Sequence, residues 1–89
     1  MNLEEARQLI HAPDASFASR VEAAITLARS PASTLDDLLA CLKHRGLPAE
    51  TAAIMLHKRT KRPERSDAIP SVITDYDDWV AYLKNAQKR

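Results

Sequence analysis

Glycine and cysteine are nearly absent from this 89-residue chain, which has one of each, Gly46 and Cys41. A single cysteine excludes an intrachain disulfide. A single glycine excludes the glycine-rich loops that cradle phosphates, and neither a P-loop nor a G-x-S-x-G nucleophile motif occurs in the sequence. We therefore expect no catalytic residues and predict that the protein is not an enzyme.

Long apolar runs are missing as well. The run Ala52–Leu56 has only five residues, and no run is longer, whereas a membrane-spanning helix needs about 20. The first ten residues include two glutamates and no long apolar region, so we expect no signal peptide. These features predict a cytoplasmic protein that does not contact membranes, since the cytoplasm is also the usual compartment of chains without disulfides.

The composition that remains is typical of a small helical domain. Hydrophobic residues make up 45% of the chain and charged residues 28%, which indicates a globular protein rather than a disordered one. The scarcity of glycine and of β-branched residues favours helices over a sheet. We expect one all-α domain over residues 1–89, folded as a compact bundle of about five helices.

Capping residues and apolar periodicity place the first two helices. The first is expected at about 3–11, with Asn2 as its N-cap. The second is expected at about 15–29, with Asp14 as its cap. Its apolar stripe at helical spacing comprises Phe17, Val21, Ala24, Ile25 and Ala28.

The same signals place three more helices. The third follows Thr34 and is expected to stop at Gly46, in the left-handed conformation that glycine tolerates. The fourth is expected at about 48–60, and its centre, AAIML, is apolar on all sides, which predicts the most buried element. The fifth follows Thr74, which is expected to cap it.

Two segments of the chain have nearly the same sequence, TLDDLLACLK at 34–43 and TDYDDWVAYLK at 74–84. Aligning 35–44 with 76–85 gives five identical residues in ten positions, and EAAITLA at 22–28 similarly resembles TAAIMLH at 51–57. This pattern predicts two copies of one helical hairpin, the second with a longer connection. Convergence is the alternative, because any amphipathic helix favours acids in its first turn and lysine near its end.

The segments SRVEAAITLA (19–28), LDDLLACLK (35–43) and AETAAIMLHKR (49–59) together resemble the alternating helices of HEAT-type repeats. The resemblance implies stacked helix pairs and a protein-binding surface. Such arrays usually need three or more repeats, and this chain holds at most two and a half. We therefore expect the helices to close into a compact bundle rather than an open array.

One spacing resembles a metal site, Cys41-x-x-His44 followed by His57. Cysteine and histidine three residues apart lie on one helix face, but a structural zinc site needs four ligands. The sequence offers no good fourth ligand. We therefore predict no metal and no cofactor.

Basic residues concentrate in the middle of the chain. The net charge is +1, yet residues 43–65 alone carry +5, between flanks of −3 and −1. The run HKRTKRPER at 57–65 indicates either a solvated helix end or a site for an anionic partner, which could be nucleic acid or an acidic protein surface. Its candidate partner-binding residues are Lys58, Arg59, Lys61, Arg62 and Arg65.

Tyr82 lies off the apolar stripe of the fifth predicted helix, and an exposed aromatic residue there would indicate a protein interface. Together these features predict a small cytoplasmic protein–protein interaction module. The alternative is a weak nucleic-acid-binding protein that uses residues 57–65. No aromatic side chains interleave with that basic run to stack on bases, which makes nucleic acid the second choice.

Overall fold

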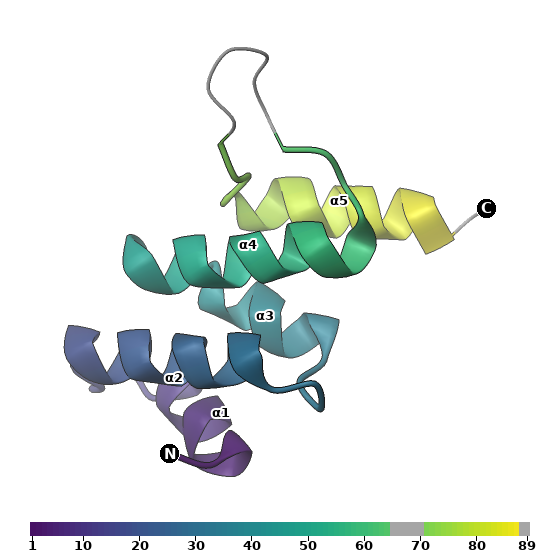
Figure 1. Cartoon of the computed structure of the whole chain (residues 1–89). Helices are drawn as coiled ribbons and strands as arrows, with labels where there is room; N and C mark the ends of the chain where they lie inside the picture. Colours follow the sequence, from purple (N-terminus) through teal and green to yellow (C-terminus); the bar gives the residue numbers. More distant parts are fainter. Residues whose placement is uncertain (65–70, 88–89) are drawn as a thin grey trace.

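A computed structural model describes residues 1–64 and 71–87 of the chain (Figure 1). Within this part the fold is all-α, as predicted, and none of its helices is both long enough and apolar enough to cross a membrane. The five helices are α1 (Leu3–His11), α2 (Phe17–Arg29), α3 (Leu35–Cys41), α4 (Leu47–Thr60) and α5 (Tyr76–Gln87).

Two of the predicted N-caps are confirmed. The Asn2 side chain accepts a hydrogen bond from the Glu5 amide at 2.8 Å. Thr34 and Asp37 form a reciprocal capping box, in which each side chain accepts from the backbone amide of the other residue, at 3.2 Å and 2.8 Å. Because these bonds satisfy amides that have no partner inside the helix, they fix where α1 and α3 begin.

The other two predicted caps were wrong by one or two residues. Helix α2 is capped by Ser16 rather than Asp14, and the Ser16 hydroxyl accepts from the Ser19 amide at 3.1 Å. Helix α5 follows Asp75 rather than Thr74, and the Asp75 carboxylate accepts from the Asp77 amide at 3.2 Å. Serine, aspartate and threonine are all good caps, so adjacent candidates compete and sequence alone does not rank them.

Gly46 has the positive φ that its sequence position suggested, but it serves another helix. Helix α3 ends at Cys41, and the chain continues through tight turns in which the Leu42, Lys43 and His44 amides each donate to the carbonyl three residues earlier. Gly46 then precedes α4 with φ +85° and ψ −141°. A side chain there would be strained, so the glycine permits the sharp entry into α4.

Helices α2 and α4 lie side by side and run in the same direction (Figure 1). The ring of Phe17 lies against Gly46 at one end, and at the other Arg59 donates to the carbonyl of Ser30. In both contacts the residue numbers differ by 29, which is also the offset between the two AAI stretches. The similar sequences at 22–28 and 51–57 are therefore neighbours at the same level of the bundle.

Alanines make up much of the buried surface of α2 and α4. Ala23, Ala24, Ala52 and Ala53 have no solvent exposure at all. Small side chains let the two backbones approach closely, and the larger apolar residues consequently lie at the edges. This reverses two expectations: Phe17 of the predicted stripe is 56% exposed, and Ile54, at the centre of AAIML, is 46% exposed.

Helices α3 and α5 lie behind α4 in Figure 1, and α1 packs mainly on α2. Helix α3 runs opposite to α2, whereas α5 runs in the same direction as α4, because the long connection after α4 returns the chain before α5 begins. The core residue of α5 is Trp79, which is fully buried. The two similar segments 35–44 and 76–85 thus enter the bundle in different ways.

Candidate protein-interaction surfaces

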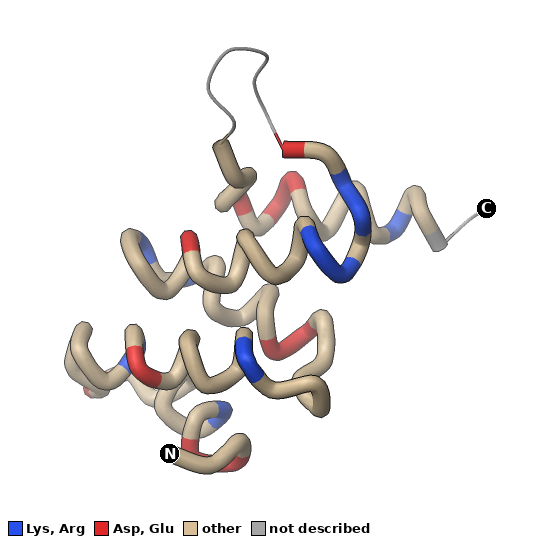
Figure 2. Tube along the Cα trace, in the orientation of Figure 1, with Lys and Arg blue, Asp and Glu red and all other residues tan. Residues whose placement is uncertain are grey.

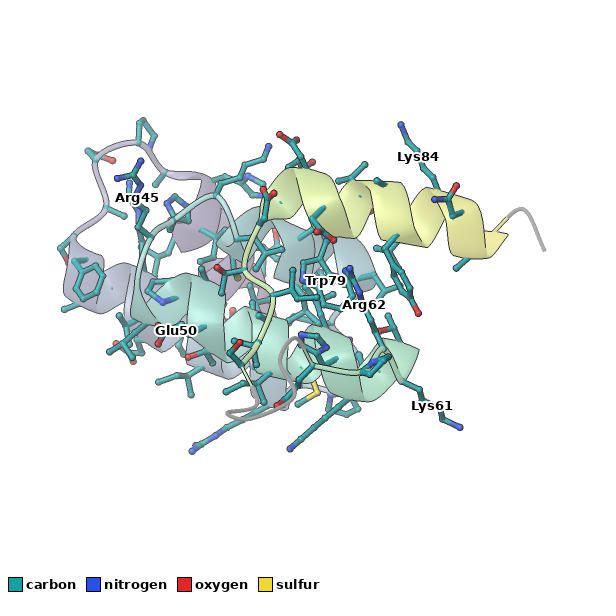
Figure 3. All side chains as sticks on the ribbon, turned by 90° about the horizontal axis from the view of Figure 1, so that it is seen from above. Arg45, Glu50, Lys61, Arg62, Trp79 and Lys84 are labelled. Atoms are coloured by element: carbon teal, nitrogen blue, oxygen red, sulfur yellow. The ribbon has the colours of Figure 1, made fainter. Side chains whose placement is uncertain are left out.

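The cations of the predicted partner site lie in two different environments. Lys58 and Lys61 are exposed, and Lys61 ends α4 with φ +59°. The side chain of Lys61 extends away from the body of the protein in Figure 3. Arg65 lies outside the described residues.

Arg59 is bound within the fold. Its guanidinium donates to the carbonyls of Ser33 and Ser30 at 2.6 Å and 2.7 Å, and to the Ser33 hydroxyl at 2.8 Å. These carbonyls belong to the turn that joins α2 to α3. Arg59 therefore ties the end of α4 to the end of α2.

Arg62 lies against two aromatic rings that are nearly perpendicular to each other. Its guanidinium carbon lies 4.7 Å from the Trp79 ring centroid and 4.4 Å from that of Tyr82, close enough for cation–π attraction. It also forms an ion pair of 2.6 Å with Asp78. Figure 3 shows Arg62 directed toward Trp79. Tyr82 is half-buried, because one of its faces is covered by this arginine.

His57 joins the same cluster from the core side. Its Nε2 lies 3.0 Å from the amide of Ile73, and its Nδ1 lies 2.9 Å from the Arg62 carbonyl. Because an amide can only donate, Nε2 accepts and the proton is on Nδ1. The Trp79 indole in turn donates to the Ile73 carbonyl. These bonds hold the long connection and α5 onto α4.

Arg59 and Arg62 are thus engaged within the chain, and Lys58 and Lys61 are the exposed cations among the described members of the basic run. A surface that attracts phosphates needs several free cations together. Within residues 57–64 the exposed cations are Lys58 and Lys61, and binding of nucleic acid by residues 57–65 stays a prediction.

Cys41 and the histidines do not converge on one point. Cys41 is fully buried, and its burial, with the Asp37 charge, raises the pKa of the thiol to about 12. Such a thiol is a poor nucleophile and a poor metal ligand, because both roles need the thiolate. His44 Nε2 lies 2.7 Å from the Ile10 carbonyl. Among the described residues no group of three or more His, Cys, Asp or Glu could hold a metal.

A shallow groove runs between α3 and α5. It consists of two adjoining hollows of about 210 Å³ and 250 Å³ that share Asp36, Leu39 and Tyr76. Lys43 lines the first hollow, with its ammonium 4.9 Å from the Tyr76 ring centroid, and Lys84 lines the second. We call this the α3–α5 groove, and its apolar lining comprises Leu35, Leu39, Ala40, Tyr76, Val80 and Leu83.

A second uncovered surface lies along the outer sides of α2 and α4. Phe17, Leu47 and Ile54 are 56%, 53% and 46% exposed. Val21, Ile25 and Met55 are half-buried on the same two helices. We call these six residues the α2–α4 face.

Sequence reasoning missed both surfaces, since their apolar residues were assigned to core stripes. For the α2–α4 face, the signal in the sequence is that large apolar residues directly follow the alanine pairs of α2 and α4. Ala23, Ala24, Ala52 and Ala53 occupy buried positions of α2 and α4, and the larger Ile25 and Ile54, which directly follow these pairs, lie on more exposed positions. For the groove, α3 is only seven residues long, too short to cover the stripe of α5.

Comparison of the chain with protein-family models, with curated proteins and with solved structures gives no match.

Proposed function

We propose that the protein is a small cytoplasmic protein–protein interaction module whose α3–α5 groove binds an amphipathic helix of another protein. The observation that carries the proposal is the groove itself, where apolar side chains of two helices line an uncovered channel. An amphipathic helix laid in such a channel buries its apolar face. It would complete the layer that α3 and α5 begin.

The groove also carries charged residues that a ligand would meet. Lys43, over the Tyr76 ring, and Lys84 are exposed and line different hollows of the groove, whereas the exposed Asp36 lines both. Residues 76 to 84 of α5 span about 12 Å at 1.5 Å per residue, so the matching ligand is about two helical turns long. We expect apolar anchors three or four residues apart and an acidic residue near each end.

Two further considerations bear on this proposal. The resemblance to HEAT-type repeats supports it, since paired helices in that family offer protein-binding surfaces. Nucleic acid is the alternative partner, and Lys58 and Lys61 are the described cations of the basic run that are free to bind it. Two cations support only weak binding that fades with salt.

The test combines capture with mapping. The protein is used to capture partners from native lysate, with and without nuclease, and a captured partner's amphipathic segment is then synthesised and titrated. We expect partners that survive nuclease and NMR shift changes confined to Tyr76, Val80, Leu83 and their neighbours. Loss of all partners with nuclease would favour the nucleic-acid alternative.

Two variants of α5 sharpen the test. Val80→Glu places a charge in the groove, whereas Ala81→Glu places the same charge on an exposed position that does not line it. We expect the peptide to bind about tenfold or more weakly to Val80→Glu and normally to Ala81→Glu. Equal affinities, with unchanged helical circular dichroism, would exclude the groove as the binding site.

A further inference from the structure

We propose that the α2–α4 face binds a second copy of the same chain, in a two-fold arrangement with the helices of the two copies antiparallel. This inference goes beyond the proposed function, because it concerns another surface and another partner. It rests on the apolar residues of the face and on the way that charges are distributed around them.

The centre of the face is apolar. The offset of 29 residues between α2 and α4, shown by the Phe17–Gly46 and Ser30–Arg59 contacts, places Ile25 level with Ile54. Ile54 is 46% exposed and Ile25 is half-buried. These two isoleucines form the middle of a band that nothing in the described structure covers.

Exposed charges of opposite sign flank this band. Glu50 and Lys58 lie four residues before and after Ile54 on one side of α4, and Glu22 and Arg29 lie before and after Ile25 on α2. Because the helices are parallel and in register, both glutamates lie toward one end and both cations toward the other, as the red and blue segments of α2 and α4 show in Figure 2.

The remaining basic side chains of α2 and α4 are engaged elsewhere. Arg20 donates to the carbonyls of Ala12 and Pro13, and Arg59 donates to the turn after α2. The salt bridges within the described residues do not involve the four flanking charges.

This pattern is complementary to itself. A two-fold axis that crosses the isoleucine band perpendicular to the helices reverses the helix direction, so it brings the acidic end of one copy to the basic end of the other. The result is the same whether α4 lies opposite α4 or opposite α2 of the second copy, since both helices have the same polarity of charge. A parallel arrangement would instead place like charges together, which is unfavourable. In a two-fold interface each such contact occurs twice.

The size of the face sets the expected affinity. Two helices of 13 and 14 residues present a patch roughly 20 Å long, and neighbouring axes about 8–10 Å apart make it about 20 Å wide. Such a patch measures about 400 Å² per copy, or about 800 Å² for the pair, which is below the roughly 1,200–2,000 Å² of stable specific interfaces and typical of a weak, transient contact. We therefore expect a dimer that forms at micromolar or higher concentration and weakens as salt is added.

Sedimentation velocity of the full chain from about 1 to about 500 μM provides the first test. We expect a reversible shift from monomer to dimer. Ile54→Asp should remove the shift, because it places two carboxylates near the axis, whereas Ala81→Asp on α5 should not. A monomer throughout this range, or a dimer unaffected by Ile54→Asp, would overturn the proposal.

Charge reversal tests the antiparallel orientation. Variant Glu22→Lys/Glu50→Lys and variant Arg29→Glu/Lys58→Glu should each dimerise about tenfold or more weakly than the native chain. Their equimolar mixture should form a heterodimer, and the combined variant with all four changes should dimerise alone. All changes are on exposed positions, and circular dichroism checks the fold. If the mixture stays monomeric while the native chain dimerises, the orientation is wrong.

Discussion

Helices α2 and α4 and helices α3 and α5 are two pairs of similar sequence that the fold treats differently. In the first pair the similar segments are 29 residues apart and lie side by side in register, and the alanines of both are fully buried. In the second pair the offset is 41 residues, because the connection before α5 is longer. The first pair is consequently a tight contact, and the second leaves a groove.

The comparison shows that similar sequences give equivalent residues similar roles, even where the two helices are placed differently in the bundle. At equivalent positions, Leu38 and Trp79 are both fully buried. Asp37 pairs with Arg7 at 3.0 Å, and its counterpart Asp78 pairs with Arg62 at 2.6 Å. At these positions each segment thus supplies a fully buried side chain to the core and a carboxylate to an arginine from elsewhere, although α3 and α5 enter the bundle in different ways.

The largest losses of stability that we expect come from truncating the two equivalent buried side chains, Trp79 and Leu38. Trp79→Ala should lower the free energy of unfolding by about 3–5 kcal/mol, because it removes a fully buried ring and the contacts with His57, Arg62 and Tyr82. Leu38→Ala should lower it by about 2–5 kcal/mol. Urea unfolding measures both.

Hydrogen exchange then separates the two variants. Since Trp79 contacts His57 of α4 and is fully buried, Trp79→Ala should release α5 and leave the amides of α2 and α4 protected. Leu38→Ala should lower protection throughout. Equal loss of protection in all helices of both variants would mean that α5 is not a separable unit.

The second effect concerns the end of the tight pair. Arg59→Ala should lower the free energy of unfolding by about 1.5–3 kcal/mol, because two carbonyls at the end of α2 lose charge-assisted hydrogen bonds. The adjacent Lys58 is exposed, so Lys58→Ala should change stability by less than about 0.5 kcal/mol. Similar values for the two variants in thermal or urea unfolding would show that the Arg59 bonds contribute little.

These two residues also show how far sequence reasoning reaches. The class of fold, the helix order and the Thr34 cap follow from spacing and composition, because they depend on residues close together in the chain. The difference between Arg59 and Lys58 does not, since it depends on which side of α4 meets the turn at Ser30 and Ser33. The run of basic residues therefore predicted that Arg59 is a surface charge, whereas its side chain links α4 to the turn after α2.

The apolar residues carry the same lesson. The periodicity at Phe17, Val21 and Ile25 correctly indicated a helix, but the side that faces the core is set by the alanines. A hydrophobicity pattern favours the larger residues as core, whereas close helix packing favours the smaller ones. The α2–α4 face could not be predicted for this reason, because it consists of large residues that lie outside the buried alanine positions.

The smallest effect that we expect tests the ion pair of α3. Burial of the Asp37 carboxyl raises its pKa, but hydrogen bonds from Arg7 and Thr34 lower it by more, so the pKa lies below its ordinary value of 3.8. The carboxylate therefore stabilises the fold fully above that value, and this contribution is lost as the pH falls through the lower, folded-state pKa. Asp37→Asn should lower the free energy of unfolding at pH 7 by about 1–2 kcal/mol, a modest value because Arg7 is partly exposed.

The pH dependence makes this prediction specific to the charge. The difference in unfolding free energy between the native chain and Asp37→Asn should stay constant from pH 7 to about 5 and shrink below 3.8. Asp36→Asn is the control, since Asp36 is in the same first turn and exposed, and it should change stability by less than about 0.5 kcal/mol. A difference for Asp37→Asn that persists unchanged to pH 2.5 would mean that the amide disrupts packing, and that the charge of Asp37 does not stabilise α3.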